Sequence, residues 1–179
     1  PKLGLKEMKE IFSIPIIGII KPTADYVKQM CIKKVGVIAT TGTIRSGAWE
    51  KSLKEEMPYI EVVNKACPLL ASIAEEGKAK SKESIEAVHE YMEIFKTKNV
   101  DTLILGCTHY PFAREQIQRV LGDQVQIFDG GEGTAREMRR RLAEKGLLRE
   151  EERRGNIVFQ NSLADDTKIA LCRRLLQIT

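Results

Sequence analysis

Short apolar runs alternate along most of the chain with segments whose apolar residues recur at helical spacing. The runs are brief, nearly unbroken and rich in β-branched residues, which is typical of strands covered on both faces of a parallel sheet. They predict strands near residues 15–20, 35–39, 60–63, 102–106 and 125–128. Alternating strands and helices indicate parallel strands joined by crossover helices.

The segments between these runs are predicted helices. Residues 81–95 place Ile85, Val88, Met92 and Phe95 on one helix face, which should lie against a core. Further helices are expected over about 5–12, 22–31, 44–56, after 68 and over 111–121. From residue 130 the pattern changes to a charged helix up to about 145, a polar linker over 148–155, a strand at 157–160 and a last helix from 164.

We therefore expect an α/β fold, a three-layer sandwich with a parallel sheet, built as two similar domains. Residues 22–128 make a complete domain of this kind, which is the second of the two. Residues 1–21 are expected to be a remnant of the first domain, and residues 129–179 a carboxyl-terminal segment that returns to it. The first domain is then incomplete in this chain.

Composition argues against several function classes. The chain has 29 lysines and arginines and 25 acidic residues, so its net charge of +4 comes from a surface of mixed charge. No nucleic-acid partner is implied. No apolar run approaches the roughly 20 residues of a membrane span, and no leader pattern opens the chain, so we expect a cytoplasmic protein without membrane contact. The four widely spaced cysteines contain no Cys-x-x-Cys pair, and no metal site is expected.

The best candidate for chemistry is the turn at residues 106–111, Gly-Cys-Thr-His-Tyr-Pro. In open α/β sheets ligands bind beyond the carboxyl ends of the strands, and Cys107 directly follows a predicted strand. Nearby backbone N–H groups and the start of a helix favour the thiolate there and are suited to a substrate carboxylate. The alternative is that Cys107 is a small buried apolar residue, but Thr108 and His109 beside it favour a catalytic role.

Two other turns lie at predicted strand ends. The hydroxyl-rich turn 39–46 contains Thr40 and Thr43, which are suited to binding a carboxylate, although a helix N-cap at Thr41 or Thr43 explains the pattern equally well. The third turn, Ala-Cys-Pro at 66–68, leads to Glu75, whose carboxylate could orient a histidine across a cleft. An ordinary surface glutamate is the alternative.

These turns, in this order, resemble the cofactor-independent glutamate racemases of the aspartate/glutamate racemase superfamily. The match covers nearly the whole chain, and its most specific part is the cysteine motif at residues 103–111. The other matching segments are 15–20, 35–40, 42–43, 46–48, 66–68, 75–77, 134–137 and 146–148.

The resemblance implies interconversion of L- and D-glutamate for peptidoglycan synthesis in a bacterium, with no cofactor. One thiolate removes the α-proton, and a thiol on the opposite face returns one. Cys107 corresponds to one of these groups, His109 assists it and also contacts substrate, and Glu75 supports the cleft. Thr108, with Thr40 and Thr43, corresponds to substrate-binding positions. The expected partner is glutamate, and a homodimer is a further expectation.

The sequence departs from this family in one respect. The Asp-Ser-Gly, Tyr-Gly and Cys-Asn-Thr segments that precede this region in the family have no counterpart here, and Cys31, Cys67 and Cys172 do not match the second catalytic thiol. We therefore expect this chain alone to be an incomplete, inactive enzyme. Two alternatives stay open: a thiol hydrolase using Cys107 and His109, and a non-catalytic remnant that binds dicarboxylates or a partner protein.

Overall fold

The computed structural model describes residues 4–30, 32–149 and 155–176, and within them a four-stranded parallel sheet has the order β2-β1-β3-β4. The strands are β1 (Lys34–Ala39), β2 (Glu61–Ala66), β3 (Thr102–Leu105) and β4 (Gln126–Asp129). They confirm the strands predicted near 35–39, 60–63, 102–106 and 125–128.

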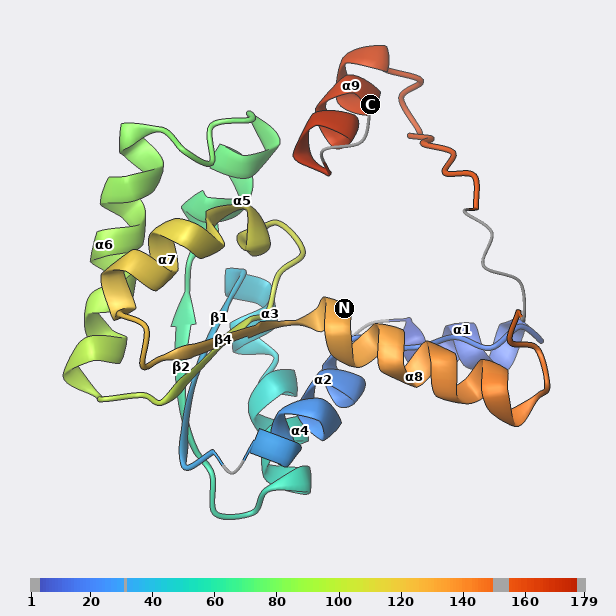
Figure 1. The fold of residues 1–179 in the computed structure, drawn as a ribbon, viewed down its shortest axis with the longest axis horizontal. Coiled ribbons are helices and arrows are strands. Elements are labelled where there is room, and N and C mark those ends of the chain that lie inside the picture. Colours follow the sequence, from blue (N-terminus) through green and yellow to red (C-terminus); the bar gives the residue numbers. More distant parts are fainter. Residues whose placement is uncertain (1–3, 31, 150–154, 177–179) are drawn as a thin grey trace.

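Helices cover both faces of the sheet, as expected for a three-layer α/β fold (Figure 1). One face carries α5 (Pro68–Glu75), α6 (Lys82–Thr97), the 3-10 turn η2 (Tyr110–Ala113) and α7 (Arg114–Leu121). The other carries α2 (Ile20–Val27), with its 3-10 extension η1 (Lys28–Met30), and α4 (Ala48–Glu56). The remaining elements are α1 (Leu5–Ile11), α3 (Thr41–Arg45), α8 (Gly130–Glu144) and α9 (Asp166–Leu175).

The core forms because successive side chains of a strand point to opposite faces. On β1, Val37 packs with the α4 residues Trp49 and Leu53, whereas its neighbour Ile38 joins the cluster under α6. Gly36 permits a close approach on that second face, since a Cβ atom there would lie 2.6 Å from Cδ1 of Phe95. The sheet is therefore buried on both sides.

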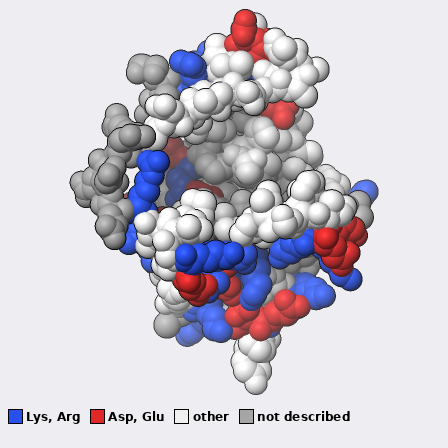
Figure 2. All heavy atoms as spheres, turned by 90° about the vertical axis from the view of Figure 1, so that its right-hand side faces the viewer, with Lys and Arg blue, Asp and Glu red and all other residues white. Residues whose placement is uncertain are grey.

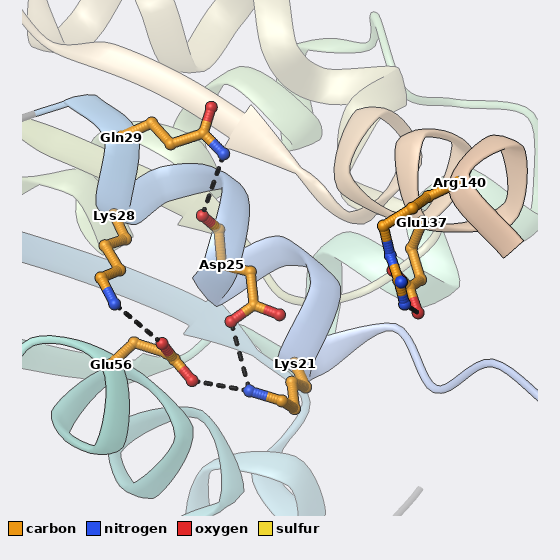
Figure 3. Close-up of polar contacts among 7 residues, drawn as sticks. All are labelled: Lys21, Asp25, Lys28, Gln29, Glu56, Glu137 and Arg140. Carbon is orange, nitrogen blue, oxygen red and sulfur yellow. Dashed lines mark hydrogen bonds and ion pairs between the residues drawn. The ribbon is translucent and has the colours of Figure 1, made fainter. Parts of the chain in front are cut away.

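Helix α2 is held against α4 by charged side chains (Figure 3). The Glu56 carboxylate lies 2.6 Å from Nζ of Lys21 and 3.2 Å from Nζ of Lys28, and Lys21 also pairs with Asp25. Hydrogen bonds from the two lysines lower the pKa of Glu56 below its ordinary value. Figure 3 also shows Glu137 and Arg140, which pair within α8.

Helix α8 continues directly from β4 and lies beside α2 (Figure 1). A Cβ atom at Gly133 would lie 2.6 Å from the Pro22 carbonyl oxygen, so the absence of a side chain lets the two helices touch. The Arg136 guanidinium lies 4.8 Å from the centre of the Tyr26 ring. The charged helix predicted over 130–145 is confirmed.

Two predicted strands are wrong. Residues 15–18 have no regular structure, and Ile20 begins α2 instead, where the Thr23 hydroxyl donates to the Ile19 carbonyl at 2.7 Å. Residues 157–160 are also irregular, with Ile157 and Val158 exposed. Neither segment pairs with a strand of the described sheet, and without a ladder of hydrogen bonds an apolar, β-branched pattern does not make a strand.

Other boundaries also shift. The helix predicted over 44–56 is divided at Gly47, whose positive φ of 63° separates α3 from α4. The helix predicted over 111–121 begins as the 3-10 turn η2. Ile85 is exposed, and Ser84 takes the buried position beside it on α6.

Some predicted features fall outside the described residues. They are Cys31 at the end of the helix predicted over 22–31 and residues 150–154 of the predicted linker. Among the described helices, none is long and apolar enough to cross a membrane.

Candidate active site

The carboxyl ends of the four strands meet at one edge of the sheet. Ala39, the last residue of β1, pairs with Ala66 of β2, and Leu105 of β3 pairs with Ile38 on one side and Asp129 on the other. The turns that follow these strands therefore lie side by side. Thr40 and Cys107 follow the two central strands, so their predicted placement on one edge is confirmed.

Cys107, His109 and Glu75 form a chain of contacts at this edge. The Cys107 Sγ atom lies 3.7 Å from Nδ1 of His109, and the opposite ring nitrogen, Nε2, lies 3.4 Å from Oε1 of Glu75. The His109 side chain is 34% exposed, and Cys107 is half-buried. The structure brings the three predicted catalytic residues together in an arrangement suited to passing a proton at sulfur.

The turn after β3 places the thiol because its backbone is fixed from both sides. Gly106 donates its N–H to the Ile38 carbonyl at 2.7 Å, and Tyr110 donates its own to the Cys107 carbonyl at 3.1 Å. A Cβ atom at position 106 would lie 2.6 Å from the Trp49 indole nitrogen. Glycine is therefore required directly before Cys107.

The hydroxyl-rich turn after β1 has a structural role in addition to any binding role. Thr40, and not Thr41 or Thr43, is the N-cap of α3, and its hydroxyl accepts from the Thr43 N–H at 3.4 Å. The hydroxyls of Thr40 and Thr43 lie 3.0 Å apart. Thr108 is exposed beside Cys107. Thr40 and Thr108 thus lie on the turns after the two central strands, and Thr43 lies in α3 directly after the first of these turns.

The other cysteines have different surroundings. Cys67 is fully buried, and burial raises the pKa of its thiol to about 12, so it stays protonated at neutral pH. Cys172 is exposed on α9, and Cys31 lies outside the described residues. Of the thiols that the structure describes, Cys107 is therefore the one that combines partial exposure with a histidine contact.

Two further residues shape this edge, and the sequence analysis did not identify either of them. Tyr110 is fully buried and its hydroxyl donates to the Cys67 carbonyl at 2.7 Å. Asp129 caps α8 through the Gly131 N–H at 2.8 Å and pairs with Arg114 at 2.8 Å. A tyrosine directly after His109, and an Asp-Gly-Gly run at the end of a strand, were the available signals.

The surface is hollowed on the side of the molecule that faces right in Figure 1. Figure 2 shows this hollow between the upper end, where α9 lies, and the lower part, where Lys and Arg side chains gather together with Asp and Glu side chains. One groove of about 800 Å³ runs between α7 and the end of α9, lined by Phe112 and Leu175 among others. A second, of about 1070 Å³, lies between α1 and α8 over Ile16, Ile17 and Ile19.

Known proteins with this architecture identify the family. The family model described as Asp/Glu/hydantoin racemase matches residues 1–138. The chain belongs to this family. Curated relatives include glutamate racemases from Bacillus cereus, 38% identical over 156 residues, and from Geobacter metallireducens, 39% identical over 154 residues. These alignments cover 87% and 86% of this chain but 58% and 57% of the relatives, so the chain spans a little over half their length.

Solved structures of racemases share the fold. The glutamate racemase from Bacillus anthracis aligns with a TM-score of 0.74 and 38% identity, over 82% of this chain and 55% of that one. The enzyme from Francisella tularensis, solved in complex with D-glutamate, aligns with a TM-score of 0.80 and 30% identity, over 96% and 64%. These similarities support the racemase fold expected from the cysteine motif.

Proposed function

We propose that this protein is a glutamate racemase in which Cys107 serves one face of the substrate α-carbon without a cofactor. The observation that carries the proposal is the contact of the Cys107 sulfur with His109, at 3.7 Å, at the sheet edge where the family's cysteine motif falls. The relatives named as glutamate racemases support glutamate as the substrate.

In the proposed reaction the Cys107 thiolate removes the α-proton. The S–H bond forms as the Cα–H bond breaks, and the electron pair passes into the substrate carboxylate. An acid on the opposite face then donates a proton to Cα and inverts the centre. His109, held by Glu75, orients the sulfur and stabilises its charge, while Thr40, Thr43 and Thr108 hold the substrate.

The opposing acid is proposed to be a second cysteine from the first racemase domain. In this proposal residues 22–128 form the second domain, while residues 1–21 and 129–179 belong to the first. The groove between α1 and α8 supports this division into domains, because its floor contains the apolar, partly exposed residues Ile16 and Ile17. The proposal includes a homodimer in the bacterial cytoplasm that supplies D-glutamate for peptidoglycan.

The test measures two quantities in one sample. The protein, in the form its host makes, is incubated with L- or D-glutamate in deuterium oxide. Proton NMR follows loss of the α-proton and circular dichroism follows inversion. We expect both without added cofactor. In Cys107→Ser we expect no inversion, and no exchange of the α-proton of the enantiomer that Cys107 serves. Activity that appears only with added pyridoxal phosphate, or inversion that survives Cys107→Ser, overturns the proposal.

A thiol hydrolase is the second candidate, because a cysteine, a histidine and a carboxylate in contact also suit an attacking nucleophile and its base. Incubation with an activated ester of glutamate distinguishes the two reactions. A covalent acyl group on Cys107, detected as an added mass on its peptide, favours the hydrolase. Binding of glutamate with neither exchange nor acylation favours a non-catalytic binding module.

A further inference from the structure

Tyr110 is buried between the two elements that carry the Cys107, His109 and Glu75 contacts. It is the largest fully buried side chain among the described residues, and its hydroxyl donates to the Cys67 carbonyl oxygen at 2.7 Å. Burial raises the pKa of this hydroxyl far above its ordinary value, so it remains a donor over the whole working pH range. A hydrogen bond of this kind has a fixed direction.

The acceptor of this bond lies at the start of α5. Cys67 is the N-cap residue of α5, and its own N–H donates to the Ala39 carbonyl at 3.0 Å, which ties it to the end of β1. Glu75 is the last residue of the same helix. Eight residues of helix span about 12 Å, so Cys67 and Glu75 lie at the two ends of a short helix.

Two consecutive residues therefore contact the two ends of α5. Tyr110 bonds the first end through Cys67 at 2.7 Å, and His109 contacts the last residue, Glu75, at 3.4 Å. The first contact is buried, whereas Glu75 is 60% exposed and its contact is open to water. An exposed contact between a histidine and a glutamate does not fix a helix by itself, because water competes for both groups.

We infer that Tyr110 is a positioning residue: its hydroxyl sets the place of α5, and thereby holds Glu75 against His109 beside the Cys107 thiol. The inference rests on the proposed function where it concerns catalysis. The predicted effect of Tyr110 on the Cys107 thiol does not depend on that function. Tyr110 does not contact the reacting atoms in this account. It acts through Glu75.

The test is a double-mutant cycle between Tyr110→Phe and Glu75→Gln. Phenylalanine keeps the buried ring, so the variant retains the core and loses one hydroxyl. The first readout is the rate at which iodoacetamide alkylates Cys107 between about pH 6 and 9, with each cysteine peptide quantified by mass spectrometry. This readout needs no racemase activity.

If Tyr110 acts through Glu75, each single variant changes the alkylation profile of Cys107, and Tyr110→Phe adds nothing once Glu75 is glutamine. We expect the alkylation rate of the double variant to differ at least about twofold from the product of the two single effects. Independent effects that multiply in the double variant overturn the inference. The control is Tyr26→Phe, which removes a hydroxyl from α2 on the opposite face of the sheet and should leave the profile unchanged.

A second measurement follows α5 itself. Amide hydrogen exchange should quicken along α5 in Tyr110→Phe while the amides of α6 keep their protection. Uniform loss of protection over both helices means that the substitution only loosens the core, and the inference then fails. In the racemase assay we expect kcat to fall about tenfold with KM little changed. The racemase assay uses the protein in the form its host makes. An absence of glutamate turnover in that unsubstituted protein refutes the proposed function and leaves the alkylation cycle to decide the positioning role.

Discussion

The Nε2 atom of His109 lies 3.4 Å from Oε1 of Glu75, although the two residues come from different elements on the same face of the sheet. His109 stands in the turn after β3, while Glu75 ends α5. Because Nδ1 of the same ring faces the Cys107 sulfur, the carboxylate can influence the thiol through the imidazole. Glu75, although 60% exposed, therefore lies within contact of the candidate site.

We therefore predict that Glu75→Gln lowers kcat about tenfold, because the glutamine has no charge with which to orient and stabilise the imidazole as an acid or base. The matched control is Glu76→Gln, one residue further along the chain, where the carboxylate pairs with Lys78 at 2.7 Å and does not touch His109. Both variants are made in the protein as its host makes it, and the rate of change of circular dichroism of L-glutamate measures them. Equal activity in the two would remove Glu75 from the mechanism.

Gly106 gives a prediction about stability. A Cβ atom there would lie 2.6 Å from Nε1 of Trp49 and 2.9 Å from the Ile38 carbonyl oxygen. Because that carbonyl belongs to the central strand β1, it has little freedom to move. Gly106→Ala should therefore cost about 1–3 kcal/mol of unfolding free energy, as overpacking of a core does.

The control for this prediction is Gly42→Ala in α3. Apart from its chain neighbours and the backbone of its own helix, no described atom lies within 4 Å of a Cβ placed there, and alanine favours a helix. We expect that variant to be neutral or slightly stabilised. Urea denaturation, with midpoints compared at an unchanged slope, measures both. A Gly106→Ala midpoint equal to that of the unsubstituted chain contradicts the tight contact.

The central sheet was predictable because its signals are local. Each β-branched run, such as Val35 to Ala39, carries its own strand preference and becomes a strand when neighbouring runs supply hydrogen-bonding partners. The run ending at Ile20 has the same composition but no partner strand in the described structure, and it therefore stays irregular. A strand pattern describes a preference, and pairing decides the outcome.

The candidate site likewise contains one contact between near neighbours in the sequence and another that depends on tertiary packing. Cys107 and His109 stand two positions apart in one turn, so the motif alone suggested their proximity. The contact between His109 and Glu75 depends on how α5 lies against η2, which in turn involves the buried bond from Tyr110 to Cys67. No periodicity or spacing encodes that bond. The same holds for Asp129, whose pairing with Arg114 joins α8 to α7.

Glu56 gives a prediction about pH. Hydrogen bonds from Lys21 and Lys28 lower its pKa below the ordinary value of 4.5. A carboxyl with a lowered pKa in the folded state stabilises the fold above about pH 4.5, and this contribution is lost as pH falls through the folded value. Because both lysine side chains are largely exposed, the contribution is only about 1 kcal/mol.

Glu56→Gln should therefore lower the unfolding free energy at pH 7 by about 1 kcal/mol, and the difference from the unsubstituted chain should shrink as the pH falls below 4.5. Glu55→Gln is the control, since Glu55 makes only a 3.9 Å contact with Lys51. Urea denaturation at a series of pH values gives both curves. A difference that does not vary with pH would show that the lost carboxylate matters for a reason other than its charge.

The last prediction concerns the two faces of the substrate, because a two-base reaction makes separate demands on each. Cys107 serves one face in the proposed mechanism, and Cys67 is fully buried, so its thiol is not accessible to serve the other. A polypeptide limited to these 179 residues should therefore invert neither enantiomer of glutamate. At most it should exchange the α-proton of one enantiomer with solvent deuterium, and slowly, since a thiolate without full substrate positioning loses much of its rate. Proton NMR in deuterium oxide reports exchange and circular dichroism reports inversion, and any exchange should disappear in Cys107→Ser. Net inversion by this polypeptide would mean that the opposing acid lies within it, and Cys31→Ser and Cys172→Ser would then identify the residue.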